Sequence, residues 1–200
     1  MQSISPETIF RGNYAWEKSL PQITKLTQSP LILGRGTQTT NLRNKIYIDL
    51  KNQNLDVNSG NLQFDCCYED VLRLKNIILR NNHDSVIAAG GGKVLDCGKY
   101  LADCLNIPCI TVPLSASTCA GWTALSNIYT INGQFIKDVS LKSCPKIFIF
   151  DHKFIQSAPH LSLNKNNERS LSGAKRHILC NAAKIHRKTK YEPENNNKAG

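Results

Sequence analysis

The sequence predicts an α/β fold in which helices cover both faces of a parallel sheet. Two observations carry this prediction. Short apolar segments alternate with segments of helical periodicity between residues 30 and 113, which is the order that builds parallel sheets. Residues 86–89 form a continuous apolar run that ends in glycines, as a strand buried on both faces does.

The elements before residue 84 follow from local patterns. Leu42, Ile46 and Leu50 recur every four residues and predict an amphipathic helix. The best-defined helix carries Glu69 and Asp70 in its first turn, where carboxylates complement the helix dipole. In chain order we expect an edge strand at 8–10 with a turn at Arg11-Gly12, partial helical spacing at 15–27 that Pro21 interrupts, a core strand at 30–36, the helix around Ile46, a polar loop at 52–60, a second strand at 62–66 and the helix 68–80.

The centre of the chain has the pattern of a phosphate-binding turn. The strand at 84–89 is followed by three glycines, Lys93 and a helix to Leu105. A helix N-terminus offers unpaired N–H groups to an anion, and glycines let the backbone approach it. The stretch is neither G-x-G-x-x-G nor a P-loop. The pattern alone therefore leaves a phosphate site and a plain glycine turn both open.

The remaining elements continue the alternation. A strand at 107–113 is closed by Pro113, and the following loop at 114–126 is rich in hydroxyls and small residues. Asn132-Gly133 lies between two apolar runs, 125–131 and 134–139, which predicts a hairpin with a two-residue turn. A last strand is expected at 146–151, followed by a short helix at 152–158.

Three linked motifs resemble a known family. They read Gly90-Gly91-Gly92-Lys93-x-x-Asp96, then Thr111-Val112-Pro113, then Ser126-x-x-Tyr129. Together they resemble the glycerol dehydrogenase and iron-containing alcohol dehydrogenase superfamily, which also includes glycerol-1-phosphate dehydrogenase and, more distantly, dehydroquinate synthase. The resemblance implies a Rossmann-like, dehydroquinate synthase-like N-terminal domain. It also implies an NAD(P)-dependent, metal-assisted oxidoreductase that acts on a polyol or alcohol.

The resemblance also implies the cofactor site. Gly91, Gly92 and Lys93 are expected at the pyrophosphate, and Asp96 in the first helical turn. The expected cofactor-binding residues are Arg35, Gly90, Gly91, Gly92, Lys93, Asp96, Leu114, Ser117, Thr118, Thr123, Leu125 and Tyr129. Cys119 stands near the substrate, where glycerol dehydrogenases carry Asp, which puts glycerol in doubt; a small pocket-lining residue is the preferred interpretation. The sequence identifies no catalytic residue.

Arg35 bears on the choice between NAD and NADP. Many family members have an acidic residue at the end of the first core strand, suited to the adenosine ribose hydroxyl. Arg35 stands close to that place here, and an arginine can pair with a 2′-phosphate. This favours NADP slightly; the alternative is a solvated surface arginine.

The resemblance covers residues 5–159 and then stops. Complete family members are roughly twice this length, and their second, helical half supplies an Asp and two His for zinc or iron. Arg176 stands where the metal-binding Asp is expected, so no metal ligand is assigned in this chain. We therefore expect an NAD(P)-binding domain at 1–159 and a basic, Asn- and Lys-rich tail at 160–200 that is disordered or read out of frame.

Composition narrows the remaining possibilities. The tail holds nine Lys or Arg and three Glu, so it carries +6 of the chain's net charge of +10. A basic tail can bind nucleic acid, but this one lacks the interleaved aromatic residues of such a segment. No signal peptide or membrane-length apolar run is present, so a cytoplasmic location is expected. Most of the eight cysteines lie in apolar settings, where reduced thiols serve as small hydrophobic side chains. Two functions are alternatives to a polyol or alcohol dehydrogenase. The chain is an inactive relic or dinucleotide-binding module, or it belongs to a glycerol-1-phosphate dehydrogenase-like enzyme. Its partners are expected to be the dinucleotide, a small polyol or alcohol and, as an open alternative, further copies of the chain in a homo-oligomer.

Overall fold

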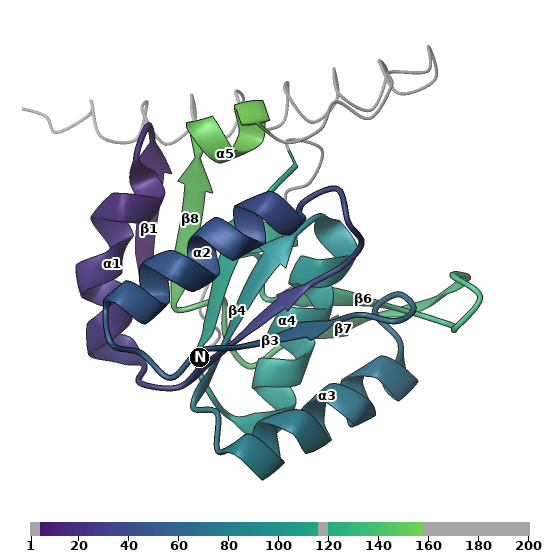
Figure 1. Cartoon of the computed structure of the whole chain (residues 1–200). Coiled ribbons are helices and arrows are strands. Elements are labelled where there is room, and N and C mark those ends of the chain that lie inside the picture. The colour runs from purple at the N-terminus through teal and green to yellow at the C-terminus, as the bar shows by residue number, and fades with distance from the viewer. Residues whose placement is uncertain (1–4, 116–119, 158–200) are drawn as a thin grey trace, which may run out of the picture. The chain divides into compact units, whose positions relative to one another are not determined.

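The computed structural model describes residues 5–115 and 120–157, whose centre is a six-stranded sheet (Figure 1). The strands lie in the order β1-β8-β5-β4-β2-β3, and every neighbouring pair is parallel. A separate antiparallel hairpin, β6-β7, lies beside α4. The predicted α/β fold with a parallel sheet is confirmed.

The bounds of the elements agree with most of the predicted ones. The strands are β1 (Thr8–Gly12), β2 (Pro30–Gly34), β3 (Asn58–Asn61), β4 (Ser85–Gly90), β5 (Cys109–Pro113), β6 (Leu125–Tyr129), β7 (Phe135–Ser140) and β8 (Ile147–Asp151). The α-helices are α1 (Ala15–Leu26), α2 (Thr40–Asn52), α3 (Tyr68–Asn81), α4 (Gly92–Leu105) and α5 (His152–Ser157), and a 3-10 turn η1 spans Ala120–Trp122. None of the described helices is long and apolar enough to cross a membrane.

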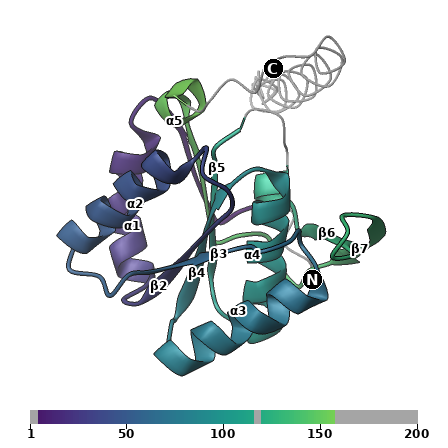
Figure 2. The same cartoon turned by 45° about the vertical axis from the view of Figure 1, so that its right-hand side comes forward.

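Helices cover both faces of the sheet, so the domain has two hydrophobic cores. α1 and α2 lie on one face, and α3 and α4 lie on the other (Figures 1 and 2). The strands of the centre are buried along their whole length, because both sets of their side chains face a helical layer. This explains why their sequences are continuously apolar.

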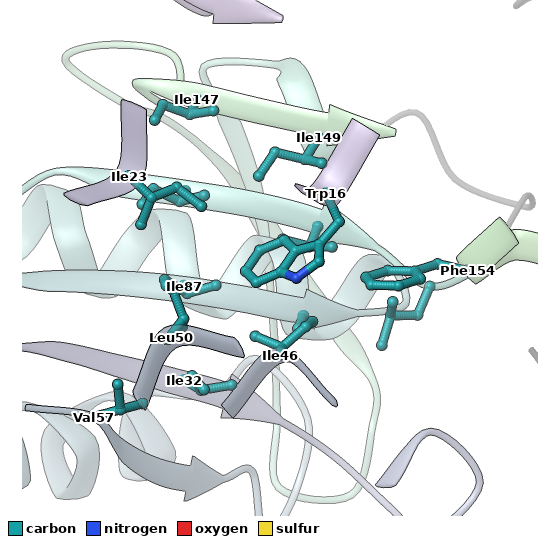
Figure 3. Close-up of a cluster of buried hydrophobic side chains, with 14 of the residues drawn as sticks. Trp16, Ile23, Ile32, Ile46, Leu50, Val57, Ile87, Ile147, Ile149 and Phe154 are labelled. Atoms are coloured by element: carbon teal, nitrogen blue, oxygen red, sulfur yellow. The ribbon is translucent and has the colours of Figure 1, made fainter. Parts of the chain in front are cut away.

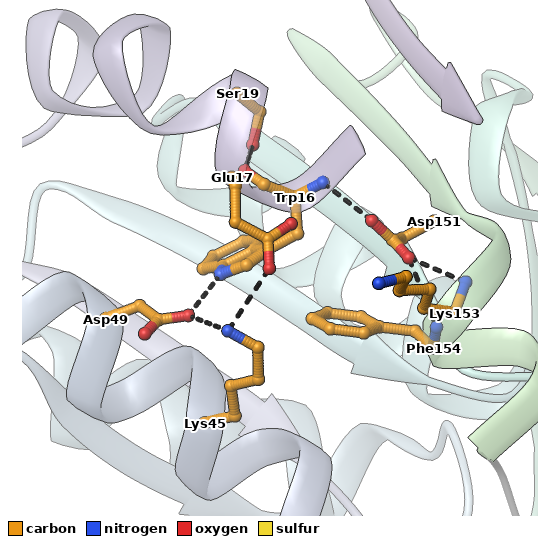
Figure 4. A network of polar contacts seen from close by, with 8 residues as sticks. All are labelled: Trp16, Glu17, Ser19, Lys45, Asp49, Asp151, Lys153 and Phe154. Carbon is orange, nitrogen blue, oxygen red and sulfur yellow. Dashed lines mark hydrogen bonds and ion pairs between the residues drawn. The ribbon is translucent and has the colours of Figure 1, made fainter. Parts of the chain in front are cut away.

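We call the core between the sheet and helices α1 and α2 the first core, and Trp16 is its largest side chain. It is fully buried among Ile23, Ile46, Ile149 and Phe154, which come from four different elements (Figure 3). Its indole N–H donates to Asp49 Oδ2 at 2.8 Å, and its backbone N–H donates to Asp151 Oδ2 at 3.0 Å (Figure 4). Trp16 therefore joins α1 to both α2 and the end of β8.

Replacing Trp16→Phe is expected to lower the free energy of unfolding by about 2 kcal/mol. The substitution removes a hydrogen bond to a charged acceptor, and such bonds contribute about 1.5–3 kcal/mol. Urea unfolding followed by far-ultraviolet circular dichroism measures the change. Asp49→Asn is the control, because its amide oxygen still accepts the indole N–H and only the ion pair with Lys45 is lost. A cost for Trp16→Phe no greater than that of the control would contradict the prediction.

One predicted strand is wrong. Residues 62–66 were expected to be a strand and 52–60 a loop, but the strand is Asn58–Asn61, which pairs with β2 at the sheet edge. Its stability comes from backbone pairing, since Gly60 is its one buried residue. Residues 63 and 64 instead donate their N–H groups to Asp70 Oδ2, at 2.9 and 2.7 Å, ahead of α3.

The turn of the β6-β7 hairpin and the course of α1 at Pro21 differ from the prediction. The β6-β7 hairpin is confirmed, but its loop is longer than two residues, because Tyr129 pairs with Phe135. Of the two predicted turn residues only Gly133 has a positive φ, of 80°, so the turn is not the expected type. Pro21 does not interrupt α1: it lies exposed inside the helix, whose opposite face is buried at Trp16 and Ile23.

Candidate functional site

The carboxyl ends of β4 and β5 meet at one edge of the sheet. Gly90 and Pro113 are partners in the parallel register, and the Leu114 N–H donates to the Gly90 carbonyl at 3.0 Å. Both chains turn away from the sheet at this point. Ligands of open α/β sheets bind outside such ends, so the turn after Gly90 is the candidate site.

The turn after β4 exposes the start of α4. Gly91 is the N-cap, with a φ of −82°, and among the described residues no atom lies within 4 Å of a Cβ built on it. The N–H groups of Gly92 and Lys93 precede the first intrahelical hydrogen bonds and point out of the helix end. An anion could therefore approach this backbone closely and meet N–H donors and the positive end of the helix dipole.

Two other glycines bring α4 onto the sheet. A Cβ on Gly90 would meet the Val94 side chain at 2.8 Å. A Cβ on Gly98 would lie 2.4 Å from the Ala88 Cβ, which is closer than real Cβ contacts occur. The absence of side chains at these two positions fixes the distance between helix and strand, and thereby the position of the helix N-terminus.

A cluster of three charged side chains lies at the same edge, and we call Arg35, Asp65 and Lys93 the edge ion cluster. Arg35 follows β2, and its Nη1 pairs with Asp65 Oδ1. Lys93 Nζ pairs with Asp65 Oδ2 and lies 4.8 Å from the centre of the Tyr129 ring. One carboxylate thus joins two cations, each of which remains about two-fifths exposed, with side-chain exposures of 42% and 41%.

A second ion pair attaches the β6-β7 hairpin to α4. Lys99 Nζ lies 3.2 Å from Asp96 Oδ1, and the two side chains are 2% and 6% exposed. Lys99 also donates to the carbonyl and hydroxyl oxygens of Thr123, both at 3.2 Å, and to the Leu125 carbonyl. The Ser126 hydroxyl donates to the Asp96 carbonyl at 3.0 Å. β6 therefore starts beside Lys99 and runs back along α4.

Asp96 does not act at the helix N-terminus as expected. Within α4, all of which is described, no acidic side chain lies in the first turn. Asp96 faces the hairpin, and burial raises the pKa of its carboxyl, while Lys99 and the Asn127 N–H act in the opposite direction. Its role is to neutralise a buried lysine that holds the hairpin.

The predicted site residues divide into three groups. Arg35, Lys93 and Tyr129 come together at the edge, beside the glycine turn. Thr123 and Leu125 lie farther along α4, at the level of Lys99, and Leu114 is buried in the first core. Ser117, Thr118 and Cys119 lie outside the described residues.

Sequence reasoning missed two residues of the site. Asp65 lay inside the strand expected at 62–66, and Lys99 lay inside the helix expected to end at Leu105 without a predicted role. The spacing of Asp96 and Lys99, three residues apart on a predicted helix, was an available signal for a charge pair. No comparable signal existed for Asp65, because its partners lie 30 and 28 residues away.

The described residues offer a place for an anion and none for a metal ion. No group of three or more His, Cys, Asp or Glu side chains within 5–115 and 120–157 could hold a metal. Six cysteines lie within the described residues, five of them buried, and burial raises the pKa of Cys109 to about 12. The five buried cysteines belong to the hydrophobic core, as predicted for most of the cysteines, whereas Cys104 is exposed.

The sequence of the chain is similar to those of known proteins. The family model described as iron-containing alcohol dehydrogenase matches residues 6–152. An uncharacterized oxidoreductase of Synechocystis sp. is 35% identical over 157 residues, which is 78% of this chain and 40% of the relative. Glycerol dehydrogenase of Thermotoga maritima is 38% identical over 95 residues, or 48% of this chain and 26% of that protein.

Solved structures share the same fold. A probable glycerol dehydrogenase from Sinorhizobium meliloti superposes with a TM-score of 0.70 at 21% identity, covering 80% of this chain and 43% of that one. Glycerol dehydrogenase from Schizosaccharomyces pombe superposes with a TM-score of 0.64 at 26% identity, covering 76% and 39%. The chain therefore spans about two-fifths of the length of the proteins whose fold it shares.

Proposed function

This chain belongs to the iron-containing alcohol dehydrogenase family, and on that premise we propose that it binds NAD or NADP for an oxidoreductase that acts on a polyol or another alcohol. The observation that carries the proposal is the open turn at the start of α4. Within the described part of the chain no atom lies within 4 Å of a Cβ built on Gly91. The first N–H groups of a helix have no intrahelical acceptor, and Lys93 adds a full positive charge at the same place.

The pyrophosphate of the cofactor would lie on this turn. The Gly92 and Lys93 N–H groups would donate to its oxygens, and the Lys93 ammonium would neutralise part of its charge. Tyr129, which lies beside Lys93, would border the same space. These groups bind and orient; the bound nicotinamide supplies the hydride-transfer chemistry.

Lys99 supports the proposal from behind the site. Thr123 and Leu125 belong to the loop that the family resemblance assigns to cofactor contact, and Lys99 holds the carbonyl oxygens of both. Held in this way, Thr123 and Leu125 keep one position before the cofactor arrives, so less conformational entropy is lost on binding.

The family also uses zinc or iron to polarise the alcohol. The described residues contain no set of side chains that fits such an ion. Polyol oxidation by the purified chain with added Zn²⁺ or Fe²⁺ tests whether the chain alone supports turnover. The binding of the dinucleotide is a separate question with a separate test.

Lys93→Ala is expected to weaken the binding of both NADH and NADPH about tenfold. It removes one charge-assisted contact to phosphate, and a tenfold change corresponds to about 1.4 kcal/mol. Nicotinamide fluorescence, titrated with the purified chain, measures both dissociation constants.

Lys146→Ala is the matched control. The side chain of Lys146 has nearly the same exposure as that of Lys93, at 43% against 41%, and it too pairs with a carboxylate, that of Glu7. It lies at the opposite end of the sheet, just before β8. Unchanged binding by Lys146→Ala and weakened binding by Lys93→Ala would support the site. Saturable binding by the unmodified chain that neither change affects would remove Lys93 from it, and no binding at all would overturn the proposed function.

A further inference from the structure

We infer that Asp65 makes this site select NAD over NADP. The inference rests on the proposed function, because it names the form of the cofactor that the same site takes. It reverses the expectation drawn from Arg35 alone, and it depends on a contact between side chains that are 30 residues apart.

Asp65 is in the right place for this role. It follows β3, which pairs with β2, and Arg35 directly follows β2, so the two side chains meet at the carboxyl edge of neighbouring strands. In dinucleotide-binding sheets an acidic residue near this edge accepts a hydrogen bond from the ribose 2′-hydroxyl, whereas an arginine accommodates a 2′-phosphate. The chain has no acidic residue directly after β2, and the fold supplies one from the next strand.

The contacts of Asp65 decide which of its neighbours is available. Its side chain is only 7% exposed, and its two oxygens are taken by Arg35 and Lys93 respectively. The edge ion cluster therefore carries a net charge of +1 from its three members. If Lys93 serves the pyrophosphate, which both cofactors share, Arg35 and Asp65 remain as a neutral pair.

A neutral pair treats the two cofactors differently. A 2′-hydroxyl can donate a hydrogen bond to the Asp65 carboxylate, and because the hydroxyl is uncharged, the pair of Arg35 and Asp65 stays neutral. A 2′-phosphate would have to displace a carboxylate that Arg35 already binds, and it would then lie close to that carboxylate with a like charge. Asp65 thus acts against NADP twice, by occupying Arg35 and by repelling the phosphate.

A second arginine near this edge is already engaged in holding the loop. Arg43 donates from Nη1 to the Arg35 carbonyl at 3.2 Å and to the Thr39 hydroxyl, and from Nη2 to the Gly36 carbonyl at 2.7 Å and to the Thr40 hydroxyl at 3.3 Å. Four of its five N–H groups therefore have acceptors in the loop after β2 or in the first residue of α2. Arg43 fixes the backbone that carries Arg35.

The test is the ratio of the NADH and NADPH dissociation constants for the full chain and for Asp65→Asn. The unmodified chain is expected to bind NADH more tightly than NADPH. Asp65→Asn should tighten NADPH at least tenfold more than NADH, because a charge-assisted contact between Arg35 and the phosphate becomes possible. Adding Arg35→Ala to Asp65→Asn should remove that gain.

Glu7→Gln is the control for charge, since it also removes one carboxylate that pairs with a lysine, but at the opposite end of the sheet. It should leave the ratio unchanged. An equal gain for both cofactors in Asp65→Asn, or a gain that survives Arg35→Ala, would overturn the inference while the proposed function stands. Thermal unfolding of each variant shows whether the domain is intact; an intact Asp65→Asn without the gain also overturns the inference. If the unmodified chain binds neither dinucleotide, the proposed function fails, and the inference fails with it.

Discussion

Lys99→Met is expected to lower the free energy of unfolding by about 3–5 kcal/mol at pH 7.5, which is the cost of leaving one member of a buried ion pair without its partner. Methionine retains most of the volume of lysine but cannot neutralise Asp96 or donate to the Thr123 and Leu125 carbonyls. Chemical denaturation followed by circular dichroism measures the loss. The same variant should bind NADH less tightly, because Thr123 and the start of β6 are no longer held to α4.

The loss should depend on pH in a defined direction. Burial raises the pKa of Asp96 above its value in the unfolded chain, so the folded state binds the proton more tightly. The contribution of Asp96 to stability is therefore present at low pH and is lost as pH rises from the unfolded pKa through the folded pKa. Lys99 opposes the shift, and its removal raises the pKa of Asp96 further. The deficit of Lys99→Met relative to the unmodified chain should therefore be smaller near pH 4 than at pH 7.5.

A double variant separates the charge from the hydrogen bonds. Asp96→Asn combined with Lys99→Met removes both members of the pair, so no charge is left without a partner. It should recover part of the lost stability at pH 7.5 and abolish the extra pH dependence. A single variant as stable as the double one at every pH would show that the ion pair has no such role.

Gly98→Ala is expected to lower the free energy of unfolding by about 3 kcal/mol, the upper end of the cost of overpacking a well-packed core. The added Cβ would lie 2.4 Å from the Ala88 Cβ, and both atoms are attached to backbone that cannot rotate away. α4 must move off the sheet. Because the helix N-terminus moves with it, cofactor binding should weaken as well.

Gly91→Ala is the matched control for this substitution. It adds the same methyl group seven residues earlier, where a Cβ meets no described atom within 4 Å and φ is −82°. It should change the free energy of unfolding by no more than about 1 kcal/mol, the cost of a poorer N-cap. If the pyrophosphate lies on this turn, Gly91→Ala should nevertheless weaken NADH binding about tenfold. Equal stability losses in the two variants would contradict the packing argument.

The sequence predicted the centre of the fold because its signals are local. A strand buried on both faces is continuously apolar, as in β4, and an amphipathic helix repeats its apolar residues, as in α3. The glycines after β4 and the position of Lys93 could be read in the same way. The motifs between Gly90 and Tyr129 led to the family that residues 6–152 match.

The predictions failed where stability comes from the backbone or from the context of the fold. β3 has the sequence Asn-Ser-Gly-Asn and is a strand because its backbone pairs with β2 at the sheet edge. A polar segment of four residues shows no pattern in the sequence that would predict a strand. Asp96 was expected to complement a helix dipole, but the packing of the hairpin on α4 turned it into the partner of a buried lysine.

The sequence by itself determined the fold class, the glycine turn and the charges available near it. Only the tertiary structure decided which charges face each other. Asp65 meets Arg35 and Lys93 because β3, β2 and β4 are neighbours in the sheet, although their residues are 30 and 28 positions apart in the chain. The interaction energy of an ion pair decreases with distance and is screened by salt, so only charges that the fold brings together interact strongly. The order of the strands, which no local sequence pattern encodes, therefore sets the electrostatics of this site.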